Sequence, residues 1–478
     1  RPPKADSMEL LAHTLSEDIH YLISDNLLRG AADTYFSGKV LARVGRVISI
    51  ANELKALASD PDTTCKTLYD PALVDMKLCK ESAKAAQKVK LPTDHQVEAA
   101  LAMLRDAVEV WVNGLAEATY VYDKTWGGLI NCGCNYTIPK GKTGSEGSCS
   151  NTAPYECPAL TDVNVDFGNA YYNDHHYHYG YHIYAAAVVA QFDPDWALQW
   201  MDNIMLYIRD IANPSKDDPY FPQYRHKDWY LGSSWASGLA SFREIHGRNQ
   251  ESSSEAIAAY EGVALFGSAM ERAVAIAQAN SSNKQDALDL KTIAATAREI
   301  HQTGRLLTAM ELHGTQRYWH VWNSTVPGYE HVNSYPSQYT RPVVGMLYET
   351  MASFQTWFSG GDMASIGIQL LPFTPVAEAR DDPVWAAQTF VAYNQSCASD
   401  HDFCVKNGWS VMLSGLEATI GQYQDALDDA MLIPDKVFSS EGGCGHSRTN
   451  LIWYIATRPS VDIQENISTN SNATNTTL

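Results

Sequence analysis

Residues suited to chemistry on a neutral ligand gather in Asp166–Tyr181, where acids stand among tyrosines, histidines and asparagines. Aromatic faces stack on sugar rings, and Asn, His and Tyr edges bind hydroxyl groups. Asp174, just before a helical pattern, can have its pKa raised in such surroundings and act as a general acid. It can equally be a helix N-cap beside buried, hydrogen-bonded histidines. Because His178 and His182 are four residues apart, a metal site is a third interpretation.

A second group of carboxyl side chains lies in Gly247–Ala256, where Glu251 and Glu255 are one helical turn apart on the same face. Like charges at this spacing mildly destabilise a helix, and the three serines between them are poor helix formers. Local conflicts of this kind are typical of functional sites. The alternative is a solvated acidic helix start that the helix dipole favours. The local sequence supports both interpretations equally.

A third segment, Tyr224–Gly238, alternates aromatic residues with charged and small ones. This pattern suits a surface on which sugar rings stack, and it suits tryptophans packed in a core equally well. The segment alone does not distinguish the two.

The whole chain has 478 residues, of which 45% are hydrophobic and 19% charged, enough for a large folded core. Its formal net charge of −20 disfavours nucleic acid and anionic membranes as partners. No apolar run reaches the roughly 18–20 residues that span a bilayer. Walker, dinucleotide, Gly-x-Ser-x-Gly and His-Glu-x-x-His motifs are missing from the sequence, so we predict neither cofactor nor metal. The start at Arg1-Pro2-Pro3 is interpreted as a processed or trimmed product.

Nine cysteines indicate an oxidising compartment, because most of them cluster in loops. The Cys-x-Cys and Cys-x7-Cys spacing of the first loop lacks the pairing typical of zinc sites. We predict disulfides within the Cys132–Cys157 loop and between Cys397 and Cys404; the groups are Cys132, Cys134, Cys149 and Cys157, then Cys397 and Cys404, then Cys65 and Cys79, with Cys444 left over. Seven Asn-x-Ser/Thr sequons agree with secretion: Asn135, Asn280, Asn323, Asn394, Asn466, Asn472 and Asn475.

Apolar residues recur at helical spacing almost throughout, and alternating strand patterns are scarce. Asp193-Pro194 reads as an N-cap and first-turn proline. About a dozen helices joined by aromatic loops predict an all-α double-helical toroid. The loop Asn131–Asn164 is too long for a plain connector. The expected helices include His13–Arg29, Lys39–Leu57, Val97–Leu115, Asp193–Ile211, Glu251–Gln278, Asp286–Met310, Arg341–Phe358 and Ser410–Asp425.

Together these segments resemble glycoside hydrolase family 81, the endo-β-1,3-glucanases, from roughly Leu11 to Pro459. The resemblance rests on Asp33–Lys39, Tyr122–Gly128, Tyr172–Tyr181, Asn249–Ala256 and Gly367–Pro375. Where the family motif reads Gly-His-Ser-Trp, this chain has Gly232-Ser233-Ser234-Trp235, and Gly360–Ile366 also departs from the usual wording. We expect the lost histidine to alter subsite binding or rate without touching the three carboxyl groups.

The resemblance implies an (α/α)6 toroid that hydrolyses β-1,3-glucan with inversion and without a cofactor. By position Asp174 matches the general acid, and the Glu251/Glu255 pair contains the general base. We prefer Glu255 as base, with Glu251 binding substrate or holding the water. An inverting enzyme places its two carboxyl groups about 6.5–9.5 Å apart. The residues expected to bind substrate are Tyr122, Trp126, Tyr172, Asn173, His175, His176, His178, Tyr179, Arg225, Asp228, Trp235, Asn249 and Gln250.

We expect a lead-in at residues 1–10, a catalytic domain at 11–460 and a Ser/Thr/Asn-rich tail or linker at 461–478. Family members usually carry an N-terminal β-sandwich, which this chain has no room for. We expect a secreted or cell-wall monomer that binds β-1,3-glucan, without nucleic acid or a membrane span. A non-catalytic or weakly active glucan-binding or receptor protein on this scaffold is the alternative, and a toroid polysaccharidase for another polymer is a weaker one.

Overall fold

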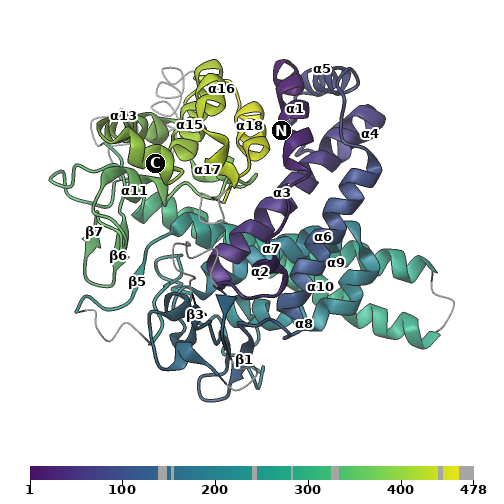
Figure 1. Ribbon diagram of the computed structural model, residues 1–478, viewed down its shortest axis with the longest axis vertical. Helices are drawn as coiled ribbons and strands as arrows, with labels where there is room; N and C mark the ends of the chain where they lie inside the picture. Colours follow the sequence, from purple (N-terminus) through teal and green to yellow (C-terminus); the bar gives the residue numbers. More distant parts are fainter. Residues whose placement is uncertain are drawn as a thin grey trace, which may run out of the picture.

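The computed structural model describes residues 1–137, 148–151, 156–239, 245–280, 284–323, 333–439 and 445–461. Helices dominate these ranges, and the strands are short (Figure 1). The helices are α1 (Met8–Asp18), α2 (Asp25–Leu28), α3 (Thr34–Ser59), α4 (Pro61–Thr67), α5 (Met76–Ala86), α6 (Asp94–Val112), α7 (His175–Phe192), α8 (Pro194–Ala212), α9 (Ser253–Asn280), α10 (Lys284–Tyr318), α11 (Asp362–Gly367), α12 (Ala377–Arg380), α13 (Pro383–Ser399), α14 (His401–Lys406), α15 (Trp409–Thr419), α16 (Tyr423–Leu432), α17 (Asp435–Ser439) and α18 (Arg448–Thr457), with 3-10 turns η1 (Ala5–Ser7), η3 (Pro158–Leu160) and η4 (Val165–Tyr171).

The strands form three small antiparallel sheets: β1 (Tyr120–Asp123) with β2 (Gly128–Asn131), β3 (Tyr136–Thr137) with β4 (Ser148–Cys149), and β5 (Asn249–Gln250) with β6 (Met346–Tyr348) and β7 (Ala352–Ser353). The third sheet joins segments about a hundred residues apart, because Asn249 pairs with Tyr348 and Gln250 with Leu347. It therefore holds the segment just before α9 against the loop that follows α10.

An inner ring of helices is formed by α3, α7, α9, α11, α15 and α18. Successive members pack together, and α18 closes the ring by packing against α3. Between α9 and α11 the link is made by hydrogen bonds, with Ser252 Oγ donating to Ile368 O at 3.1 Å and Ser254 Oγ at 2.8 Å. The helices α6, α8, α10, α13, α16 and α1 pack outside this ring (Figure 1). The predicted (α/α)6 double-helical toroid is confirmed.

Helix α7 lies at the centre of this packing, between α3 and α9. Its residues from His175 to Ala190 are all buried, on every face of the helix. A helix with no exposed polar face is stable only when other elements enclose it. Small residues allow that enclosure, since a Cβ added at Gly180 would lie 2.4 Å from the Cβ of Ala259 on α9. The histidines and tyrosines that open α7 are therefore inside the protein.

The expected helix at Arg341–Phe358 is wrong, because the described structure places β6 and β7 there. Pairing of β6 with both β5 and β7 satisfies its backbone groups, so tertiary contacts override the helical spacing of its apolar residues. A second correction concerns Glu251, which precedes α9; the helix begins at Ser253. The two glutamates are therefore not held by one regular helical turn.

Two other expected helices are each divided in the structure. His13–Arg29 contains α1 and α2, which are separated by residues 19–24, where Ser24 is extended. Ser410–Asp425 covers α15 and the start of α16, since Gly421 has a φ of 87° that ends a helix. By contrast α8 begins as predicted, with the Asp193 carboxylate accepting from Trp196 N at 3.1 Å.

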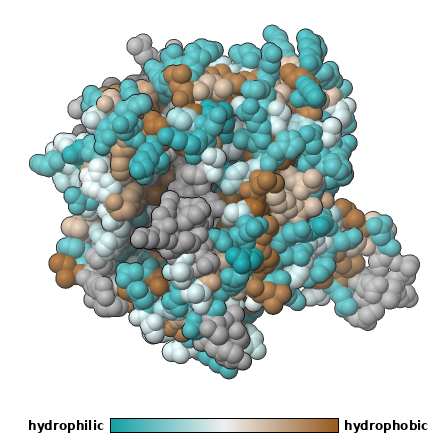
Figure 2. All heavy atoms as spheres, viewed as in Figure 1, coloured by the Kyte–Doolittle hydropathy of each residue, from teal (hydrophilic) through white to brown (hydrophobic). Residues whose placement is uncertain are grey.

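Four disulfides are present: Cys65–Cys79, Cys132–Cys157, Cys134–Cys149 and Cys397–Cys404. They confirm the pairing predicted inside the Cys132–Cys157 loop and between Cys397 and Cys404. Cys444 and the sequon asparagines Asn466, Asn472 and Asn475 lie outside the described residues. Hydrophilic residues cover most of the face seen in Figure 2, with smaller hydrophobic patches between them. None of the described helices is long and apolar enough to cross a membrane.

Candidate active site

The segment that carries Asp174 has an unusual backbone. Of the five non-glycine residues with positive φ in the described chain, four lie here, namely Asp166, Phe167, Tyr172 and Asp174. A left-handed conformation costs such a residue about 1–2 kcal/mol, so surrounding contacts must hold it. Backbone strain of this kind clusters at functional sites.

Asp174 occupies the N-cap position of α7, yet its carboxyl group does not cap the helix. Its backbone N–H donates to Ala236 O at 2.9 Å, and its carbonyl accepts from Tyr177 N at 2.9 Å. The residue as a whole is partly exposed, and its carboxyl group has no hydrogen bond to any residue that the structure describes. Burial raises its pKa well above the ordinary value, and the charges of Glu251 and Glu255 raise it further. Asp174 therefore stands at the N-cap position, as one interpretation predicted, but its side chain does not cap the helix.

Glu251 lies between β5 and α9 and is partly exposed. Its Oε1 accepts from Trp357 N at 2.7 Å, and its backbone carbonyl accepts from Gln369 Nε2 at 2.7 Å. Burial raises the pKa of Glu251 to about 7, and the nearby charge of Glu255 adds to this. Among the charges that raise the pKa of Asp174, that of Glu251 comes first. Glu251 therefore combines access to solvent with proximity to Asp174.

Glu255, in the first turn of α9, is only 3% exposed. Its Oε1 accepts from Tyr181 Oη at 2.6 Å and from Tyr35 Oη at 2.8 Å. Lys39 Nζ lies 3.6 Å from the same oxygen and 4.2 Å from the centre of the Tyr35 ring. Hydroxyl donors and an ammonium group stabilise the ionised form of a carboxylate. Glu255 is therefore held in place by side chains of α3 and α7.

Several residues predicted to bind substrate surround the β1–β2 hairpin beside this site. Tyr122 is 38% and Trp126 54% exposed, so both rings are accessible. Arg225 donates to Trp126 O at 3.2 Å and its guanidinium lies 4.4 Å from the centre of the Tyr172 ring. Tyr172 is buried and donates to Asp123 Oδ2 at 2.9 Å. These contacts join the hairpin to the residue two positions before Asp174.

The predicted residues His175, His176, His178 and Tyr179 are buried, at 0–1% exposure. Each of these side chains is hydrogen-bonded within the protein, as when Tyr179 Oη donates to Leu129 O at 2.6 Å and His176 Nε2 lies 3.2 Å from Gln250 Nε2. Burial lowers the pKa of His176 to about 3 and that of His178 well below its ordinary value, so both rings are neutral. The prediction that these side chains bind substrate is therefore not supported, because they lie in the interior of the protein.

The remaining predicted residues lie in three segments near Asp174, one of which contains Ala236, whose carbonyl accepts from Asp174 N. Trp235 is buried, and its Nε1 donates to Asp228 Oδ2 at 3.2 Å. Gln250 is buried and donates to Ser234 O at 2.6 Å, while the Asn249 carbonyl accepts from Ala236 N at 2.8 Å. Asn173 is partly exposed beside Asp174. Ser233, which stands where the family has histidine, is 2% exposed and is thus enclosed by protein.

One group of described side chains has metal-ligand composition: His175, Asp210 and His226, with ligand atoms within 4.8 Å of one another. His175 Nδ1 lies 2.6 Å from Asp210 Oδ1, and its Nε2 lies 2.8 Å from Asn169 O. Both neighbours are acceptors, so hydrogen bonds already use both ring nitrogens. His178 and His182, the pair considered from the sequence, both contact Thr34: His182 Nε2 lies 2.9 Å from Thr34 O, and His178 Nδ1 contacts Thr34 Oγ1. These contacts explain the histidines as structural.

Sequence reasoning missed two sets of residues at this site. Tyr35, Lys39 and Tyr181 hold Glu255, although they lie in segments already singled out for their composition. Trp357, which is 58% exposed and contacts Glu251, was hidden inside the expected helix Arg341–Phe358. The Gly360-Gly361 pair after its aromatic run is the signal that could have indicated a loop.

Fold and site together define a helical toroid with three neighbouring carboxyl groups from α7 and the start of α9. The sequence profile of the glycosyl hydrolase family 81 C-terminal domain matches residues 156–292 and 277–455, and the chain belongs to this family.

Known relatives and a solved structure are consistent with this membership. A glucan endo-1,3-beta-D-glucosidase of Glycine max is 28% identical over 461 residues, which is 95% of this chain and 53% of that protein. The primary septum glucan endo-1,3-beta-D-glucosidase of Schizosaccharomyces pombe is 26% identical over 85% of this chain and 30% of its own length. A solved family 81 structure from Clostridium thermocellum shares the fold, with a TM-score of 0.59 and 21% identity over 95% of this chain and 48% of that one. The chain thus spans about half the length of the first two of these proteins or less.

Proposed function

We propose that this chain hydrolyses internal β-1,3 bonds of glucan with inversion at the anomeric carbon. Membership of family 81 and relatives named glucan endo-1,3-beta-D-glucosidases support the substrate. The observation that carries the chemistry is the carboxyl group of the partly exposed Asp174, which is unbonded within the described chain and raised in pKa. A carboxyl group whose pKa is raised keeps its proton to higher pH and can donate it to a leaving oxygen.

Asp174 is the general acid in this proposal. As the C1–O3 bond of the glucan breaks, the Asp174 proton passes to the departing O3 oxygen. The carboxylate that remains lies near Glu251 and Glu255, whose charges favour its taking up a new proton. Neighbouring anions thus help the acid to return to its starting state after each turnover.

Glu251 is the general base, because it is the partly exposed glutamate next to Asp174. A water held on the opposite ring face transfers a proton to Glu251 while its oxygen bonds to C1, which yields the α-anomer. The amide of Trp357 holds Glu251 Oε1 at 2.7 Å and so orients its carboxylate. The sequence alone favoured Glu255 for this role. Its enclosure by Tyr35, Tyr181 and Lys39 is the reason for preferring Glu251.

Glu255 then serves as a fixed charge. Its charge raises the pKa of both Asp174 and Glu251, and Tyr181 holds its carboxyl group in place. Exposed rings near the carboxyl groups, Trp126, Tyr122 and Trp357, are suited to stack on glucose units. Asn173, partly exposed, is suited to bind a sugar hydroxyl. The buried residues His175, His176, His178 and Tyr179 position these groups without touching the substrate.

The four disulfides and the sequon sequences support a secreted or cell-wall location for the protein. Asn394 is exposed on α13 and is available for glycan attachment. A net charge of −20 is consistent with a neutral polysaccharide substrate. We propose that the chain acts as a monomer, since a toroid of this type carries all three carboxyl groups on one chain.

Incubation with laminarin and measurement of new reducing ends tests the activity. A parallel panel with β-1,4-glucan, α-glucan and an anionic polysaccharide tests the linkage, and NMR of fresh product should show the α-anomer first. Binding of laminarin without cleavage would instead establish a glucan-binding protein. Cleavage with the β-anomer appearing first would mean retention and would overturn the assigned roles, because a retaining nucleophile lies only about 5 Å from the acid.

A further inference from the structure

The direction of the Asp174 carboxyl group depends on its backbone, because no described residue hydrogen-bonds to the carboxyl itself. That backbone is left-handed at Asp174, with a φ of 57°. The preceding turn has further left-handed residues at Asp166, Phe167 and Gly168, with φ values of 50°, 55° and 79°. A backbone in this state relaxes unless contacts hold it. The residues that hold the turn therefore decide where the acid points.

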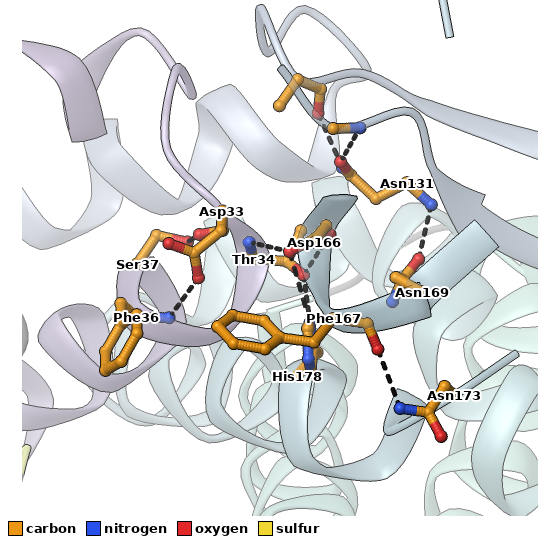
Figure 3. Close-up of polar contacts among 12 residues, drawn as sticks. Asp33, Thr34, Phe36, Ser37, Asn131, Asp166, Phe167, Asn169, Asn173 and His178 are labelled. Atoms are coloured by element: carbon orange, nitrogen blue, oxygen red, sulfur yellow. Dashed lines mark hydrogen bonds and ion pairs between the residues drawn. The ribbon is translucent and has the colours of Figure 1, made fainter. Parts of the chain in front are cut away.

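The turn is anchored to the start of α3 by one buried carboxylate (Figure 3). Asp166 Oδ1 accepts from Thr34 N at 2.9 Å, and Asp166 Oδ2 accepts from Thr34 Oγ1 at 2.8 Å. Thr34 is the first residue of α3. Burial and the charge of Asp33 raise the pKa of Asp166 well above its ordinary value, and the hydrogen bonds from Thr34 act in the opposite direction. His178 of α7 contacts Thr34 Oγ1, and its Nδ1 lies 3.7 Å from Asp166 Oδ1. Two ring helices thus meet at Asp166.

Short links carry this anchor forward to the acid. Asn173, the residue before Asp174, donates from Nδ2 to Phe167 O at 2.8 Å and from its backbone N–H to Gly168 O at 3.2 Å (Figure 3). Asn169 Oδ1 accepts from Asn131 N at 2.7 Å. A movement of the residues beside Asp166 is therefore transmitted to Asn173 and to the start of α7.

We propose that Asp166 is a positioning residue for the general acid: its paired hydrogen bonds with Thr34 hold the left-handed turn that aims the Asp174 carboxyl group at the leaving oxygen. Asp166 itself is buried and does not touch the substrate. The inference rests on the proposed role of Asp174. It assigns a role in the reaction to Asp166, which by its burial and its place in a loop would otherwise count only as a structural residue.

The test uses the full chain and separates acid positioning from general damage. In Asp166→Ala both acceptors for Thr34 are removed, while Thr34→Val removes the hydroxyl and keeps the backbone amide. Both variants should lower kcat on laminarin by roughly ten- to a hundredfold, because small misplacements of catalytic groups cost this much. KM should change by less than about threefold, since binding contacts are unchanged. Asp162→Ala is the matched control, an exposed aspartate four residues earlier in the same loop.

A second substrate isolates the acid. A laminari-oligosaccharide with a 2,4-dinitrophenolate leaving group needs no proton from Asp174, so both variants should cleave it at close to the unaltered rate. Equal loss on the two substrates, or no loss on laminarin, would overturn the positioning role. If Asp166→Ala fails to fold, by circular dichroism and thermal unfolding, Thr34→Val carries the same comparison. Inactivity of the unaltered chain on laminarin would instead refute the proposed function.

Discussion

Replacing Glu251 and Glu255 in turn by glutamine should show which of them is the general base and which only supplies a charge. Glu251→Gln removes the group proposed to accept the proton of water, so kcat should fall by roughly 10²–10⁴-fold. Glu255→Gln removes a charge that has no contact with the water in this proposal. It also removes the carboxylate that lies 3.6 Å from Nζ of Lys39, which is 4% exposed, and the loss should therefore be partly one of stability. Thermal unfolding measured beside kcat separates these effects.

The pH dependence of kcat/KM measures how far the charge of Glu255 shifts the pKa values of Asp174 and Glu251. In the proposed mechanism Glu251 must be ionised to act as base, so activity should fall as the pH drops through its pKa of about 7. Asp174 must be protonated to act as acid, so activity should also fall as the pH rises through its raised pKa. In Glu255→Gln both limbs should move to lower pH, because the charge of Glu255 raises both pKa values. Burial raises the pKa of Glu251 more than the charge of Glu255 does, so most of the rise should remain in the variant. The acid limb should therefore move by roughly 0.5–1 pH unit, or about 1 kcal/mol.

Azide provides the decisive comparison. A small anion can take the place of the activated water at C1, and it should restore turnover to Glu251→Gln with formation of the α-glycosyl azide. It should not restore Glu255→Gln. Glu271→Gln, on the same helix and paired with His301 at 3.1 Å, is the matched control and should keep both pH limbs. Rescue of Glu255→Gln in place of Glu251→Gln would refute the reasoning from exposure and make Glu255 the base.

Three further outcomes are expected. Asp174→Asn should lower laminarin cleavage by roughly 10²–10⁴-fold with folding intact, and should spare an aryl substrate with a good leaving group; comparable loss on both substrates would contradict its role as acid. Activity should survive dialysis against EDTA, whereas a loss that a divalent ion restores would point to the group His175, Asp210 and His226. Peptide mapping without reduction should recover the four disulfide pairs, and reduction should lower the unfolding temperature, since each native disulfide contributes about 2–4 kcal/mol; free thiols at these positions would contradict the secreted assignment.

The parts of the fold that could be predicted are those whose signals are local. The Asp193-Pro194 start of α8 is an example, because an N-cap and a first-turn proline act within one turn. The helix expected at Arg341–Phe358 fails for the opposite reason. Its apolar residues serve strands whose partner, Asn249–Gln250, is about a hundred residues away. Apolar spacing within a window carries no information on such a partner.

The candidate site shows the same limit. Composition pointed to Asp174, Glu251 and Glu255, and the structure brings these three together. Composition could not separate the two glutamates, because Tyr35 and Lys39 reach Glu255 from α3, more than 200 residues earlier. Composition also predicted that the histidines of Asp166–Tyr181 bind sugar. A segment rich in His and Tyr has the same composition whether it faces the substrate or the core. Only the enclosure of α7 by α3 and α9 decides that these side chains are interior.

The three carboxyl groups owe their chemical differences to the kind of support that each receives. Asp174 is fixed through a strained backbone, and no described hydrogen bond at its carboxyl group opposes the rise in its pKa. Glu251 accepts one hydrogen bond from a backbone amide, which orients its carboxyl group. This hydrogen bond lowers the pKa of Glu251 by less than burial raises it. Glu255 accepts from two hydroxyl groups and lies near an ammonium group, so its carboxyl group is fixed in place. Changing the support of Asp174 should alter the acid step alone, and changing that of Glu251 the base step alone. Loss of the Glu255 charge should shift both pH limbs, so the kinetic tests above can tell the three apart.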